Sequence, residues 1–76
     1  MPHVIIKMYA GRSDEQKRAL AEAVAGAVVA AANCAERSVS VSIEDVQPED
    51  WTEQVYGPDI AAKPDQLFKE PGYDPR

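Results

Sequence analysis

The sequence has few of the residues that form covalent links, metal sites or membrane spans. Its 76 residues include one cysteine and one histidine. No apolar run reaches the about 20 residues that a membrane-spanning helix needs. The single cysteine excludes an internal disulfide framework, and nothing in the sequence resembles a set of zinc ligands. We therefore expect neither a metal nor a membrane partner.

Positive charge is also scarce. Eight lysine and arginine residues stand against 13 aspartate and glutamate residues, which gives a formal net charge of -5. This balance argues against nucleic acid or an anionic membrane surface as a partner. No basic stretch followed by an apolar one begins the sequence, so the expected location is the cytoplasm.

The length predicts one domain, residues 1–76, with a core over about 2–46 and a tail over 47–76. A domain of this size buries only about 60% of its unfolded surface when it folds alone. Small domains without disulfides or metals often gain stability by forming oligomers. We therefore expect an oligomer.

Residues 3–9, HVIIKMY, are typical of a strand because β-branched and aromatic residues dominate and a Gly-containing turn follows. Val4, Ile5 and Ile6 are apolar at consecutive positions, so both faces of this strand should be covered. One helix can cover only one face. The other face therefore implies a partner chain.

A helix is expected over residues 14–32. Ser13 and Gln16 have the spacing of a capping box, and Asn33 is suited to a left-handed stop. Small and branched apolar residues recur at helical spacing and predict the buried face: Ala19, Leu20, Ala23, Val24, Ala27, Val28 and Ala31.

Apolar and polar residues alternate over 38–46, SVSVSIEDV, which is the pattern of a half-buried strand. Strand, long helix and strand in this order predict a right-handed βαβ unit with parallel strands.

The tail is interrupted by prolines. Pro48 fits the first turn of a short helix, and Gly57 is expected to end it. Further prolines leave room for at most a short helical turn around 65–70, DQLFKE. We interpret the tail as a lid or an oligomer clasp.

Pro2 follows the initiator methionine directly and allows two interpretations. Proline is tolerated as the first residue of a strand, where its missing N–H is not needed. If Met1 is removed, however, Pro2 becomes a free secondary amine, which can act as a base. An α-amino group titrates near 8, and desolvation or neighbouring cations lower its pKa towards neutrality.

Five motifs together resemble one family. They are the initial Met-Pro, Gly-Arg-Ser-Asp-Glu-Gln-Lys at 11–17, Ser-Val-Ser-Val at 38–41, Gln-Pro-Glu-x-Trp at 47–51 and Lys-x-Pro-Gly-Tyr at 69–73. Their combination resembles the tautomerase superfamily, specifically the 4-oxalocrotonate tautomerase group. The last two motifs resemble its dimeric phenylpyruvate-tautomerase branch.

This resemblance implies an α+β fold in which a β-α-β protomer pairs into a four-stranded sheet with two helices on one face. It implies cofactor-free keto–enol tautomerisation of a small 2-oxo acid. A homodimer is expected, with a hexamer as the alternative.

The resemblance also implies roles for individual residues. Pro2 would move the proton as general acid and base. Arg12, after Gly11, would offer a planar fork to a substrate carboxylate or enolate oxygen. Trp51 would form an aromatic wall of the pocket and exclude water from the amine.

Two further residues are candidates for substrate binding. The family's second arginine is replaced here by Ser40, which can donate one hydrogen bond but carries no charge. This change favours a monocarboxylate over a dicarboxylate substrate. His3 could line the pocket or pack at a subunit interface.

Lys7 is expected to be a solvated strand lysine, and Cys34 to be structural.

Two other functions are possible on the same scaffold. One is a hydratase or dehalogenase activity, in which protonated Pro2 and Arg12 assist the addition of water. That reaction needs an additional carboxylate, which the sequence does not place. The other is a dimeric binding module without catalysis.

Overall fold

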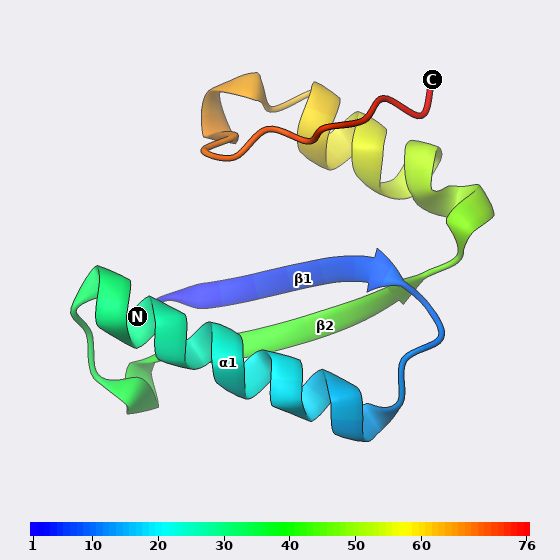
Figure 1. Cartoon of the computed structure of the whole chain (residues 1–76). Helices are drawn as coiled ribbons and strands as arrows, with labels where there is room; N and C mark the ends of the chain where they lie inside the picture. Colours follow the sequence, from blue (N-terminus) through cyan, green and yellow to red (C-terminus); the bar gives the residue numbers. More distant parts are fainter.

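The computed structural model describes all residues from Met1 to Arg76. Two strands, β1 (His3–Tyr9) and β2 (Ser40–Val46), form a parallel two-stranded sheet. The long helix α1 (Asp14–Ala32) connects them, and a helical C-terminal segment follows β2. Figure 1 shows α1 on one side of the sheet and the C-terminal segment on the other. The predicted β-α-β unit with parallel strands is confirmed.

The pairing register of the sheet decides which side chains share a face. His3 lies opposite Ser40, and the pairs continue in step to Tyr9 opposite Val46. Val41 and Ile43 lie on the sheet face that α1 covers, where they line a shallow hollow together with residues of the helix. Successive side chains of a strand point to opposite faces, so His3, Ser40 and every second residue after each of them lie on the opposite face.

Helix α1 has the predicted ends. The Ser13 side chain accepts a hydrogen bond from the Gln16 backbone N–H, and the Gln16 side chain accepts one from the Ser13 N–H. Asn33 ends the helix in the left-handed conformation, with φ 53°. Capping box and stop signal are both confirmed.

The predicted apolar face of α1 is partly wrong. The half-buried apolar residues are Leu20, Ala21, Val24, Ala25, Val28 and Val29. The alanines at 19, 23, 27 and 31 are exposed instead. Alanine stands on almost every side of this helix, so only the branched residues identify the buried stripe. Leu20, Val24 and Val28 belong to both the predicted and the observed face. The observed face is rotated towards the residues that follow them, Ala21, Ala25 and Val29.

The second strand is shorter than predicted. Residues Glu36–Ser38 form a 3-10 turn, η1, and the strand begins at Ser40. The Ser38 hydroxyl donates to the Ala35 carbonyl at 2.7 Å, which holds that residue in the turn. A serine that bonds to nearby backbone leaves the strand ladder in this way.

The C-terminal segment differs most from its prediction. A 3-10 turn, η2 (Pro48–Asp50), is followed by a π-type helix, η3 (Thr52–Ala61), and by a short turn, η4 (Pro64–Gln66). Gly57 does not end the helix, which continues through Pro58. A Cβ at Gly57 would lie 3.2 Å from the Thr52 carbonyl oxygen, so this glycine permits a close backbone approach.

The enclosed core is small. Only Val46, Val55 and Tyr56 are buried, and they belong to the end of β2 and to η3. Ile5, in the middle of β1, keeps 61% of its surface exposed. The C-terminal segment thus covers part of the second sheet face and leaves the rest open. No helix in the structure has the length and apolar character needed to cross a membrane.

Candidate active site

The residues predicted for the site lie at the two ends of β1. Pro2 precedes the strand, and Arg12 follows it after Gly11. A strand of seven residues spans about 20 Å, so one protomer keeps Pro2 and Arg12 well apart. The predicted site is therefore divided into two groups of residues.

The first group, which we call the N-terminal cluster, consists of Pro2, His3 and Ser40. The Ser40 backbone N–H donates to the Pro2 carbonyl at 3.2 Å. His3 Nδ1 and Ser40 Oγ form a hydrogen bond of 2.7 Å. Parallel strands place their amino ends at the same edge of the sheet, so these residues meet although they are far apart in sequence. Pro2 is half-buried, while His3 and Ser40 are exposed.

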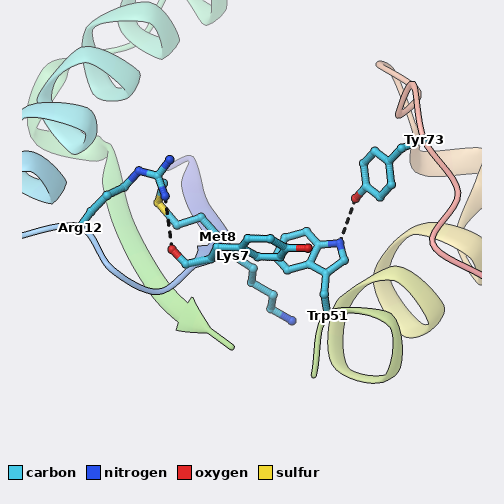
Figure 2. A pocket seen from close by; sticks show the side chains of 6 residues that line it. Lys7, Met8, Arg12, Trp51 and Tyr73 are labelled. Carbon is cyan, nitrogen blue, oxygen red and sulfur yellow. Dashed lines mark hydrogen bonds between the residues drawn. The ribbon is translucent and has the colours of Figure 1, made fainter. Parts of the chain in front are cut away.

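The second group, the aromatic pocket, lies at the other end of the sheet. Its cavity of about 380 Å³ lies between β1, the turn after it and the C-terminal segment (Figure 2). The lining residues are Lys7, Met8, Tyr9, Arg12, Trp51 and Tyr73. Arg12 and Trp51, two of the predicted site residues, are thus brought together by the fold.

Arg12 lies exposed at this pocket. The chain turns at Gly11, whose φ of 128° is one that a residue with a side chain rarely adopts. Arg12 Nη1 donates to the Tyr9 carbonyl at 3.3 Å, and the guanidinium forms no ion pair. A guanidinium has five N–H donors, so most of them remain available to a ligand.

Trp51 forms one wall of the pocket. Its ring packs edge-on against Tyr9, with centroids 5.2 Å apart and an interplanar angle of 83°. Its Nε1 donates a hydrogen bond to Tyr73 Oη at 2.9 Å (Figure 2). The indole is therefore fixed from both sides and presents a planar surface for an aryl or dienyl group.

Lys7 is not the solvated lysine that the sequence predicted. Its ammonium is partly buried and donates to Asp59 Oδ2 at 2.6 Å. This hydrogen bond raises the pKa of Lys7, against the opposing effect of desolvation. The prediction failed because η3 folds back over β1 and brings Asp59 to it. Lys7 also lines a neighbouring groove of about 500 Å³ beside η3.

The pocket favours an anionic ligand. Two cations, Lys7 and Arg12, line it, and no acidic residue does. This composition is notable in a chain whose net charge is -5. Lys7 is already paired with Asp59, so Arg12 is the free cation.

Four lining residues were not assigned to the site from the sequence: Lys7, Met8, Tyr9 and Tyr73. The only signal for Tyr73 was the closing motif at 69–73, which indicated a family branch but no role.

Outside the pocket, Cys34 is half-buried and its Sγ lies 4.0 Å from the Val28 carbonyl oxygen, which agrees with a structural role. No group of three or more His, Cys, Asp or Glu side chains converges in the structure.

Comparison with known proteins gives one consistent result. The family model described as "Tautomerase enzyme" matches residues 2–58. A "Probable tautomerase" of Xylella fastidiosa (strain 9a5c) is 44% identical over 73 residues, which cover 96% of this chain and 89% of that protein. "Tautomerase PptA" of Enterobacter sp. (strain 638) is 46% identical over 74 residues, which cover 96% and 97% of the two chains.

Solved structures agree with these relatives. A 4-oxalocrotonate tautomerase isozyme from Methylibium petroleiphilum is 40% identical with a TM-score of 0.63, over 66% of this chain and 81% of that one. TomN, a 4-oxalocrotonate tautomerase homologue in the tomaymycin biosynthetic pathway, is 29% identical with a TM-score of 0.63, over 82% and 92%.

Fold and relatives together define the protein as an isomerase that interconverts tautomers. The chain belongs to the tautomerase family, and within it to the group that resembles 4-oxalocrotonate tautomerase.

Proposed function

We propose that this tautomerase interconverts the enol and keto forms of a small 2-oxo acid, with the Pro2 nitrogen as general acid and base. The observation that carries the proposal is the aromatic pocket, which has an unpaired arginine and no acidic residue in an acidic chain. Such a pocket selects a small anion with an apolar body. A carboxylate would bind Arg12, and an aryl or alkyl group would lie against Trp51.

The proton transfer needs a base that no side chain of the pocket supplies. With Met1 removed, Pro2 is a secondary amine whose ordinary pKa is at or above that of an α-amino group, near 8. Burial in the site would disfavour the charged form of this amine, which is what a base that works near neutral pH requires. The neutral nitrogen takes the proton from the enol hydroxyl. The resulting ammonium gives a proton to the neighbouring carbon, which yields the ketone and restores the base.

The two halves of the site would meet in a homodimer. A two-fold axis perpendicular to the sheet makes the paired edge strands antiparallel and keeps both helices on one face. Pairing through the free edge of β1 would place the amino end of one protomer's strand beside the carboxyl end of the other's. The N-terminal cluster would then face the aromatic pocket of the partner, within one four-stranded sheet.

In this arrangement His3 and Ser40 would polarise the substrate. Their 2.7 Å hydrogen bond joins them beside Pro2, where the reacting oxygen would lie. A hydroxyl or imidazole donor stabilises developing negative charge less than an arginine does. We therefore propose a monocarboxylate as the substrate.

The experiment compares protein with and without Met1. In the chain that retains Met1, Pro2 nitrogen is an amide whose lone pair is delocalised, so it cannot act as a base. Processed protein should tautomerise a 2-oxo acid enol, with kcat/KM rising as pH passes through the pKa of the amine. Intact mass establishes which form is present. Unprocessed protein should fold and show little turnover, and equal activity of both forms would overturn the role of Pro2.

A further inference from the structure

The C-terminal strap, residues 69–76, brings a hydroxyl group to the aromatic pocket. The strap leaves η4 and runs back along η3 in an extended conformation (Figure 1). Tyr73, in the middle of the strap, lines the pocket together with Arg12 and Trp51. The strap therefore contributes a polar atom to the same cavity.

The direction of one hydrogen bond decides what this hydroxyl can do. An indole N–H only donates, so Tyr73 Oη is the acceptor in its 2.9 Å bond with Trp51 Nε1. This is the sole hydrogen bond of the Tyr73 side chain in the structure. The hydroxyl proton is not used by Trp51 and is free to be donated elsewhere. Figure 2 shows the hydroxyl directed towards Trp51 at the side of the pocket.

Tyr73 keeps 47% of its surface exposed, and its ring packs on one side against Tyr56. The ring lies 5.7 Å from that of Tyr56, which is buried, at an interplanar angle of 56°. The guanidinium of Arg76 lies 5.0 Å from the centre of the Tyr56 ring. Arg76 also forms an ion pair with Asp74. A side chain held in this way loses little further freedom when it binds a ligand.

We propose that Tyr73 is a substrate-binding residue whose hydroxyl donates a hydrogen bond to an anionic oxygen of the substrate. This inference rests on the proposed function and assigns a second polar contact in the pocket, beside Arg12. Arg12 supplies charge and Tyr73 supplies a neutral donor, and both line the cavity that would hold the substrate.

The test compares a charged ligand with a neutral one of the same shape. Phenylacetate and phenylacetamide are titrated against the processed wild-type protein and its Tyr73→Phe variant, with the fluorescence of Trp51, the sole tryptophan, as the readout. Tyr73→Phe should weaken phenylacetate binding about tenfold, the order expected for a hydrogen bond to a charged group. Binding of phenylacetamide should fall much less.

Tyr56→Phe is the matched control, because it removes the same atom from the neighbouring ring, which does not line the pocket. It should leave the affinity for phenylacetate unchanged. Thermal unfolding of both variants detects any loss of structure. Equal weakening of both ligands by Tyr73→Phe, or no weakening, would overturn the proposal.

The two proposals can fail separately. If the processed wild type does not turn over 2-oxo acid enols, the proposed function fails, while the phenylacetate titration still decides the role of Tyr73. If the wild type is active and Tyr73→Phe keeps both kcat/KM and phenylacetate affinity, Tyr73 does not bind the substrate and the proposed function stands.

Discussion

At the scale of single residues, Arg12 offers the most direct test of the aromatic pocket. Arg12→Ala should lower kcat/KM for a 2-oxo acid enol by about tenfold to a hundredfold, the effect of losing a hydrogen bond to a charged group. The midpoint of thermal unfolding should hardly change, because the side chain is exposed and forms no ion pair.

Arg18→Ala is the control for this measurement. Arg18 is exposed on α1 and does not line the aromatic pocket. Its loss changes the net charge by the same amount and should leave kcat/KM unaltered. If Arg12→Ala behaves like Arg18→Ala, Arg12 has no part in substrate binding.

The Lys7–Asp59 ion pair should give stability a dependence on alkaline pH. Its hydrogen bond raises the pKa of Lys7 above the ordinary 10.5, so the folded state holds this proton more tightly than the unfolded state. The contribution is complete below pH 10.5 and is lost as pH rises through the higher, folded-state pKa.

Denaturant unfolding of wild type and Lys7→Met at pH 8 and above pH 11 would measure this loss. The difference between the two proteins should shrink at the higher pH. Lys69→Met, at an exposed lysine without an ion pair, should show no such change. A difference between wild type and Lys7→Met that stays constant with pH would contradict the prediction.

The sequence identified some site residues and missed others for a physical reason. Arg12 and Trp51 stand in motifs whose local context indicates their function. The contributions of Lys7 and Tyr73 depend on contacts that form only when the chain folds back, over 52 and 22 residues respectively. A local sequence pattern cannot predict contacts between residues so far apart in the chain.

At the scale of elements, two glycines with different surroundings make a matched pair. A Cβ at Gly57 would lie 3.2 Å from the Thr52 carbonyl oxygen, while a Cβ at Gly26 in α1 would meet nothing within 4 Å. Gly57→Ala should therefore destabilise the protein, because backbone must move. Gly26→Ala should stabilise it by up to about 1 kcal/mol through helix propensity.

Thermal and urea unfolding at one protein concentration would measure both changes. Opposite signs are expected for the two variants. If Gly57→Ala is also stabilising, the close approach inside η3 is not a constraint, and the glycine acts only through its flexibility.

The elements were predicted with unequal success. Strand β1 and helix α1 were confirmed because their periodicity and capping residues are local signals of the structure. The π-type helix η3 was not expected, since Gly57 and Pro58 are ordinary helix-ending signals. The helix nevertheless runs through both residues, and it buries Val55 and Tyr56, the second of which packs against Tyr73 of the strap.

At the scale of the whole molecule, the protomer is flat and sparsely enclosed. Its extents are 39 × 32 × 18 Å, and three residues are buried. Ile5 and Phe68 are strongly exposed. We expect a homodimer in solution, with a thermal midpoint that rises with protein concentration because association stabilises the folded state.

Sedimentation or light scattering at micromolar concentration would test this state. The C-terminal segment covers part of the sheet face opposite α1 and is expected to prevent assembly into larger rings (Figure 1). A stable hexamer would contradict the prediction, and so would a monomer whose thermal midpoint is independent of concentration.

The position of the buried residues also bears on synthesis. All three follow residue 45, so the first part of the chain leaves the ribosome without any residue that it could enclose. Translation adds about 5–20 residues per second, whereas a helix forms within about a microsecond. Helix α1 can therefore form early. The sheet face opposite the helix stays uncovered until the C-terminal segment that follows β2 has been made. We therefore expect that a ribosome stalled before residue 56 would hold a chain that lacks this core and is sensitive to proteases.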